Sequence, residues 1–178
     1  MSRACTLLFL AVLASVLPAR AMAQEVYGGV FAHGVNTPFT IDTGERGVNL
    51  QAGIRFEEID ALGDAQPYVF GSVNLSGNTS FIGGGVGWKF DLGDDVYVRP
   101  GMGMIVHDGP ERRINREIIR RTDLGSRVLL APEIAVGVKL DDRWSVEASW
   151  IHMSHAGLFD DEQNPGIDTI GVRVNWRM

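Results

Sequence analysis

Apolar side chains recur at every second position along most of the chain, which is the period of a β-strand and not of a helix. From 48 to 56, for example, apolar residues at even positions alternate with polar residues or glycine at odd positions. The same alternation predicts strands near 25–33, 48–56, 67–75, 82–90, 96–106, 128–140, 144–152 and 167–176. Long helix-favouring runs are missing and glycine is abundant, at 22 residues, so an all-β fold is favoured.

Strand length and side-chain polarity together indicate a membrane protein. Several segments approach the roughly 9–11 residues with which a tilted strand crosses a bilayer. One face of each segment is apolar, whereas the other carries charges among glycines: Arg55, Lys89, Arg99, Arg127, Glu133, Lys139 and Glu147. This distribution suits an ion-paired lumen and a lipid-facing wall, whereas a soluble barrel would carry its charges outside. An even number of strands closes a barrel, so we predict an eight-stranded antiparallel transmembrane β-barrel.

The first 23 residues have the organisation of a secretory signal peptide. An apolar run over 6–17 precedes the small-x-small sequence Ala-Met-Ala at 21–23. The run is shorter than the roughly 20 residues of a membrane-spanning helix, so we expect cleavage and a barrel domain over 24–178. Cys5, the single cysteine, would be removed with the peptide, which leaves no disulfide or thiolate metal site. Export and an outer-membrane location follow from this interpretation, and we expect no cofactor.

Charge bears on the partners of the chain. Without Arg3 and Arg20, 14 of the 16 basic residues remain against 22 acidic ones, a net charge of about −8, which argues against a nucleic-acid partner. After the fifth strand, five arginines lie among four acidic residues: Arg112, Arg113, Arg116, Arg120 and Arg121 among Asp108, Glu111, Glu117 and Asp123. Guanidinium groups at this position could bind lipopolysaccharide phosphates, or the segment could be a self-paired, solvated loop.

Three polar residues stand out on the predicted lipid-facing positions of the last hairpin. His152 and Ser154 have the parity of Trp150, and Asp168 has the parity of the apolar residues of the last strand. A serine hydroxyl needs a base to take its proton, and an imidazole needs an acid to fix its tautomer. Side chains two apart on one strand are about 6–7 Å apart, so the three form a candidate catalytic triad. Spacing alone is weak support, because His and Ser are common near the rim of barrels.

Neighbouring residues are candidates for contacts with substrate. Acyl transfer requires hydrogen-bond donors to the tetrahedral oxyanion. Asn164 and the backbone amides around Ala156 and Gly157 are the candidates, together with His155 next to the serine. Asn-Pro-Gly and Ala-Gly are also ordinary turn sequences, so a purely structural role is an equal alternative.

The segments 152–157 (His-Met-Ser-His-Ala-Gly) and 164–168 (Asn-Pro-Gly-Ile-Asp) resemble the signature of the lipid A 3-O-deacylase (PagL) family. Weaker likeness extends upstream over 71–80, 106–109 and 124–127. The resemblance implies an outer-membrane barrel that removes the ester-linked acyl chain at the 3-position of lipid A. It also implies the roles of the triad, with His152 as base, Ser154 as nucleophile and Asp168 as orienting acid.

Three departures from the family pattern affect this assignment. His155 stands where the family usually has Asn, Asp168 stands where we expect Glu, and the chain ends on Met178 instead of an aromatic residue. Glu162, in the acidic loop before Asn164, is a competing acid.

Two alternative functions are weighed against the same sequence. A non-enzymatic structural barrel has no reason to gather His, Ser and Asp on its oily face, and a phospholipase would use the same acyl chemistry on another lipid. The expected partners are lipid A of lipopolysaccharide and the surrounding outer-membrane lipid. The sequence leaves open whether the chain forms a homodimer.

Overall fold

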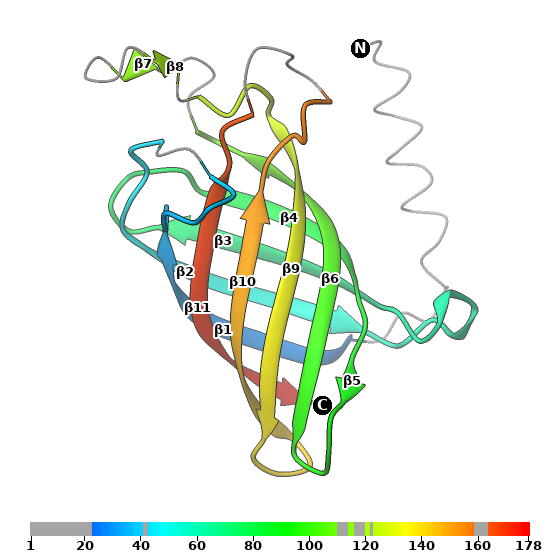
Figure 1. Ribbon diagram of the computed structural model, residues 1–178. Helices are drawn as coiled ribbons and strands as arrows, with labels where there is room; N and C mark the ends of the chain where they lie inside the picture. The colour runs from blue at the N-terminus through cyan, green and yellow to red at the C-terminus, as the bar shows by residue number, and fades with distance from the viewer. Residues whose placement is uncertain (1–22, 41–42, 110–113, 116–119, 122, 159–163) are drawn as a thin grey trace.

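Eight long antiparallel strands close into a barrel in the computed structural model, which describes residues 23–40, 43–109, 114–115, 120–121, 123–158 and 164–178 (Figure 1). Each strand pairs with its neighbours along the chain, and β1 pairs with β11 to close the sheet. The strands are β1 (Ala23–His33), β2 (Val48–Phe56), β3 (Gln66–Asn74), β4 (Phe81–Gly87), β6 (Val96–His107), β9 (Val128–Lys139), β10 (Trp144–Met153) and β11 (Ile167–Arg177). The prediction of an eight-stranded antiparallel barrel is confirmed. The predicted signal peptide lies outside the described residues, except for Ala23.

Smaller elements lie at the two ends of the barrel. The strand predicted over 82–90 is divided, because β5 (Phe90–Asp91) is separated from β4 and pairs with β6. A short 3-10 helix, η1 (Asp60–Leu62), lies between β2 and β3, and β7 (Ile114–Asn115) pairs with β8 (Arg120–Arg121) in a separate small sheet. No helix in the described part of the chain is long and apolar enough to cross a membrane.

The outer wall of the barrel is apolar. Side chains alternate between buried and exposed positions along the strands, and the exposed set is dominated by large aliphatic residues, such as Ile82 at 68% and Val172 at 57% exposure. A continuous apolar surface of this kind is unfavourable in water and suits the hydrocarbon of a bilayer.

Aromatic pairs lie at two heights on this wall. Trp144 and Trp176 pack together with ring centroids 6.3 Å apart, and Trp150 packs against Phe39 at 5.7 Å. Trp144 and Trp150 are six positions apart on β10, or about 20 Å along the strand at roughly 3.3 Å per residue. Aromatic residues favour the membrane interfaces, and the apolar band of such barrels is about 25 Å tall. The two pairs therefore lie toward opposite ends of the apolar wall.

The lumen is filled by a charged network centred on Glu147, which is fully buried. Its carboxylate accepts hydrogen bonds from Arg55 at 3.1 Å, Arg99 at 3.0 Å and the Tyr97 hydroxyl at 2.9 Å, and it is also paired with Arg173. Burying a carboxylate costs several kcal/mol unless it is paired in this way. The sequence-based placement of this residue among the lumen charges agrees with the structure.

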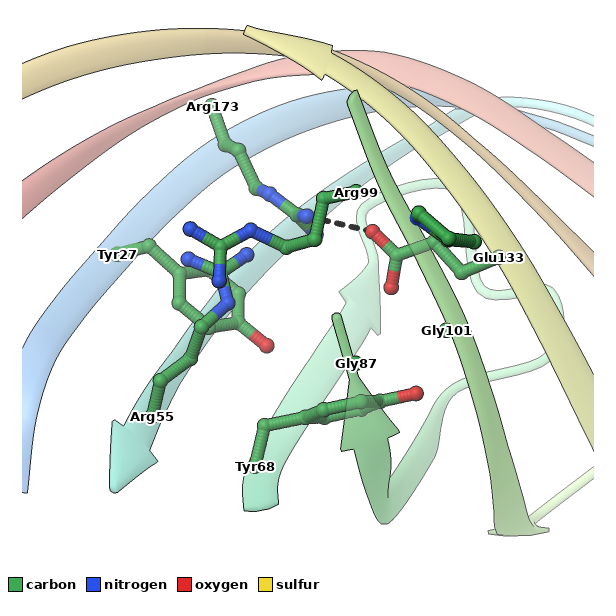
Figure 2. Close-up of a pocket in the computed structure, with 9 residues that line it drawn as sticks. Tyr27, Arg55, Tyr68, Gly87, Arg99, Gly101, Glu133 and Arg173 are labelled. Carbon is green, nitrogen blue, oxygen red and sulfur yellow. Dashed lines mark ion pairs between the residues drawn. The ribbon is translucent and has the colours of Figure 1, made fainter. Parts of the chain in front are cut away.

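Tyrosine rings occupy much of the remaining lumen, and glycines on the adjacent strands make room for them. A Cβ atom at Gly137 would lie 2.2 Å from Cζ of Tyr97. Figure 2 shows Tyr27 and Tyr68 beside the arginines and the ion pair between Arg173 and Glu133. The cavity among them has a volume of about 10 Å³, roughly the space of one water molecule.

One expected lumen charge lies elsewhere. Arg127 precedes β9 and is exposed, and its guanidinium donates a hydrogen bond to the carbonyl of Gly109 at 2.8 Å. The alternating pattern continues through 127 in the sequence, but β9 begins only at Val128. The prediction that this residue faces the lumen is therefore wrong.

The connection between β1 and β2 crosses the outer side of the barrel. Residues 35–40, which we call the strap, lie against the end of β11 that follows the long 155–166 connection (Figure 1). The amide of Val35 donates a hydrogen bond to the carbonyl of Asp168 at 3.0 Å. The contact of Phe39 with Trp150 holds the other end of the strap against β10.

Candidate active site

The candidate triad lies where β10 and β11 meet at one end of the barrel. His152 and Asp168 are direct cross-strand partners in this antiparallel pair. They share the face of Ala148 and Ile170, which are exposed on the outer wall. The parity prediction therefore agrees with the structure, and the site lies two residues beyond Trp150, at that end of the apolar wall.

The three side chains form a continuous chain of hydrogen bonds. Nδ1 of His152 lies 2.8 Å from Oδ1 of Asp168, and Nε2 of the same ring lies 3.1 Å from Oγ of Ser154. An ionised carboxylate can only accept hydrogen bonds, so Nδ1 carries the ring proton that Asp168 accepts. Nε2 is then left as the acceptor for the serine hydroxyl. One tautomer therefore satisfies both contacts, and it is the one in which the imidazole can act as a base toward Ser154.

Exposure differs sharply among the three residues. The side chain of Asp168 is fully buried, whereas that of His152 is 20% exposed. Ser154 retains 6% exposure. The carboxylate and the serine are thus both buried, and the imidazole between them is the partly exposed member of the chain. A fully buried carboxylate behind the imidazole is the arrangement expected of an orienting acid.

Backbone contacts fix the position of the serine. Ser154 follows β10 directly and forms a two-way bridge with Leu130 of β9, with N···O distances of 3.1 and 2.8 Å. Its amide is therefore occupied and does not serve an oxyanion. The chain then turns at Ala156 and Gly157, where φ is 51° and 72°. Leu158 closes this turn by donating to the carbonyl of His155 at 2.9 Å.

The other predicted contact residues are divided by exposure. Ala156, Gly157 and Asn164 are exposed, whereas His155 is fully buried. The competing acid Glu162 lies outside the described residues, as do Arg112, Arg113 and Arg116 of the arginine-rich segment.

Two contact residues of the triad were not predicted from the sequence. The Thr37 hydroxyl donates a hydrogen bond to Oδ2 of Asp168 across 131 positions of sequence. Gly166 packs so closely against the imidazole that a Cβ there would lie 2.7 Å from Cε1 of His152. Threonine-proline and proline-glycine sequences are ordinary in loops, so neither residue carried a signal that strand periodicity could reveal.

A second polar cluster lies inside the same end of the barrel. His33 is buried and contacts Glu45 at 3.1 Å and Asn49 at 3.2 Å. These contacts are satisfied within the fold and explain its burial. Within the described ranges, no group of three or more His, Cys, Asp or Glu side chains is placed to hold a metal ion.

Fold and site together define an outer-membrane β-barrel that carries a serine, histidine and carboxylate chain on its outer wall. The family model for lipid A 3-O-deacylase (PagL) matches residues 61–177. This range covers most of the chain, including β3 to β10 and the last hairpin. The chain belongs to the lipid A 3-O-deacylase (PagL) family, which confirms the resemblance found in the sequence.

Solved structures support the fold. The outer membrane enzyme PagL superposes with a TM-score of 0.62 at 18% identity, over 86% of this chain and 99% of that chain. Neisserial surface protein A (NspA) superposes with a TM-score of 0.58 at 10% identity, over 89% of this chain and 99% of that chain. No curated protein sequence matches the chain. At these identities the structural likeness speaks for the barrel, and the site must be argued from its own geometry.

Proposed function

We propose that this protein is a serine esterase that removes the ester-linked acyl chain at the 3-position of lipid A. The observation that carries the proposal is the hydrogen-bonded chain from Ser154 through His152 to Asp168 in a member of the lipid A 3-O-deacylase family. The geometry matches the roles of nucleophile, base and orienting acid.

The proposed reaction proceeds through an acyl-serine. Oγ of Ser154 bonds to the ester carbonyl carbon, and its proton passes to Nε2 of His152. The bond between that carbon and the sugar oxygen then breaks, and His152 gives the proton to the departing hydroxyl. A water molecule loses a proton to the same nitrogen and attacks the acyl-serine. The fatty acid leaves, and Ser154 recovers its proton.

Asp168 stabilises the imidazolium that forms in each step, since its Oδ1 accepts the Nδ1 hydrogen throughout. The developing oxyanion needs donors, and the exposed turn at Ala156 and Gly157 together with Asn164 supplies the nearest candidates. His155 is fully buried, so we assign it a packing role instead of contact with the substrate.

The position of the site suits a substrate dissolved in the membrane. Lipid A joins a polar sugar to acyl chains, so its ester bonds lie at the boundary between the headgroups and the hydrocarbon. The triad lies at the Trp150 end of the apolar wall, and near a membrane interface polar groups cost only about 0–1 kcal/mol. In this proposal the signal peptide over 1–23 directs export, and the triad end faces the cell exterior.

Mass spectrometry of lipid A tests the proposal. Lipid A from cells that express the protein should lose one acyl chain, and cells that express Ser154→Ala should not. Intact lipid A with the wild type, accompanied by release of fatty acid from phospholipids, would assign the enzyme to phospholipases. Deacylation that persists with Ser154→Ala would overturn the serine mechanism.

A further inference from the structure

Both oxygens of the Asp168 carboxylate are engaged, by two different parts of the chain. Oδ1 accepts the Nδ1 hydrogen of His152. Oδ2 accepts the hydroxyl hydrogen of Thr37, which lies on the strap. The backbone carbonyl of Asp168 also accepts the amide of Val35 at 3.0 Å. The strap therefore holds the acid at both its side chain and its backbone.

The direction of the Thr37 hydrogen bond follows from its surroundings. The amide of Phe39 donates to Oγ1 of Thr37 at 3.2 Å, so the hydroxyl oxygen already acts as an acceptor within the strap. A hydroxyl has one hydrogen to donate, and the carboxylate is the acceptor that this hydrogen reaches. The local fold of the strap thus aims the hydroxyl at Asp168.

Burial makes this contact important. The side chain of Asp168 is fully buried, so water does not replace a missing donor without a rearrangement. Hydrogen bonds to charged groups are among the stronger ones in proteins. Without the Thr37 hydroxyl, the carboxylate could rotate about its last bond and lose alignment with the imidazole.

We propose that Thr37 is a positioning residue of the active site, which fixes the carboxylate of Asp168 and through it the imidazole of His152. The inference rests on the proposed function. It adds a fourth residue from the first connection of the barrel, at a position that precedes the 61–177 range matched by the family model.

A set of isosteric variants tests this role in the purified, folded protein. Thr37→Val keeps the shape and removes the hydroxyl, whereas Thr37→Ser keeps the hydroxyl. We expect Thr37→Val to lower kcat by about 10- to 100-fold with little change in KM, as loss of one hydrogen bond to a charged group would predict. Thr37→Ser should retain activity within about threefold of the wild type. The matched control is Thr169→Val. Thr169 follows Asp168 and faces the lumen, and its fully buried hydroxyl has no hydrogen-bond partner among the described residues.

A double variant separates positioning from general support of the fold. In the Asp168→Asn background, Thr37→Val should cause no further loss, because the residue acts only through the carboxylate. Equal activity of Thr37→Val and wild type would overturn the inference, as would a further loss in the Asp168→Asn background. A rise in KM alone would also overturn it, since that result would place Thr37 in contact with substrate.

The assays also separate this inference from the proposed substrate. Each variant is measured on lipid A and on a short p-nitrophenyl ester, which needs the triad but not the recognition of lipid A. A loss with Thr37→Val on the simple ester supports the positioning role even if lipid A is not cleaved. If the wild type hydrolyses neither substrate, both the esterase proposal and the role of Thr37 are wrong.

Discussion

His152 and Asp168 face each other directly across the β10–β11 pair, with Nδ1 and Oδ1 2.8 Å apart. The pairing register of the two strands sets this contact, so the long connection between them does not need a particular conformation to bring the acid to the base. Strand pairing places a side chain more accurately than a flexible loop does. The register thereby provides a rigid base for the proposed chemistry.

Loss of the nucleophile or the base should abolish hydrolysis while the barrel stays folded. Both side chains lie on the outer wall, away from the lumen network, so their replacement leaves the ion pairs of the lumen intact. Ser154→Ala and His152→Asn should each lower turnover by at least about 10³-fold. Lipid A mass spectra report the activity, and the shift in electrophoretic mobility on heating reports the fold. Near-normal turnover in either variant would contradict the triad.

Asp168 should be needed for rate and for the correct tautomer. Asp168→Asn replaces the acceptor with an amide and should lower turnover by about 10⁴-fold. Asp168→Glu keeps the charge but adds a methylene in a fully buried site between Thr37 and His152. Overpacking of this kind costs about 1–3 kcal/mol, so we expect about a tenth of wild-type activity. Full activity in Asp168→Asn, with Glu162→Gln inactive, would transfer the acid's role to the loop.

Gly166 should be required for the position of the imidazole. A Cβ at this position would lie 2.7 Å from Cε1 of His152, so Gly166→Ala should push the ring away from Ser154 and lower kcat by about 10-fold or more, as small displacements at a catalytic group do. The matched control is Gly71→Ala, where the nearest atom, a methyl carbon of Ile82, is at 3.7 Å. Kinetics on a p-nitrophenyl ester compare the two, and equal activity would show that the imidazole position tolerates the methyl group.

The Glu147 network should determine stability and not chemistry. Glu147→Ala leaves Arg55, Arg99 and Arg173 without their shared carboxylate, and breaking a buried ion pair costs about 3–5 kcal/mol. Glu58→Gln, at an exposed position between β2 and β3, should change the free energy of unfolding by less than about 0.5 kcal/mol. Denaturant unfolding in detergent measures both values. A stable but inactive Glu147→Ala would contradict the assignment to the lumen.

Strand periodicity predicted most of the fold because its signal repeats in every strand. A period of two fixes which face each residue occupies, so the outward placement of His152, Ser154 and Asp168 followed from Trp150 and Ile170. The alternation did not predict where each strand begins. Arg127 continued the alternating pattern but lies just before β9, since nothing in the alternation itself marks where inter-strand pairing begins.

The site was only partly predictable for a different physical reason. Two of its three members are two residues apart at the end of β10. The third lies beyond a long connection that shows no periodic pattern in the sequence. Thr37 comes from the other end of the chain and meets Asp168 only because β1 and β11 close the barrel. Contacts that depend on barrel closure, and on a loop that crosses the outer wall, produce no periodic pattern in the sequence.

The aromatic contact between Phe39 and Trp150 provides a final test of the strap. Their ring centroids lie 5.7 Å apart, and such pairs contribute about 0.5–1.5 kcal/mol beyond their buried area. Phe39→Ala removes this anchor without touching the triad, so the strap should dock less firmly and the Thr37 hydrogen bond to Asp168 should form for a smaller fraction of the time. Because 1.4 kcal/mol corresponds to a tenfold change, we expect kcat to fall by about 2- to 10-fold.

Phe39→Leu, which keeps an apolar contact, should have a kcat between those of Phe39→Ala and the wild type. Phe90→Ala removes another exposed ring, on β5 and far along the chain from the strap, and should leave kcat unchanged. Equal kcat values for Phe39→Ala and Phe90→Ala would show that the strap stays in place without its aromatic anchor.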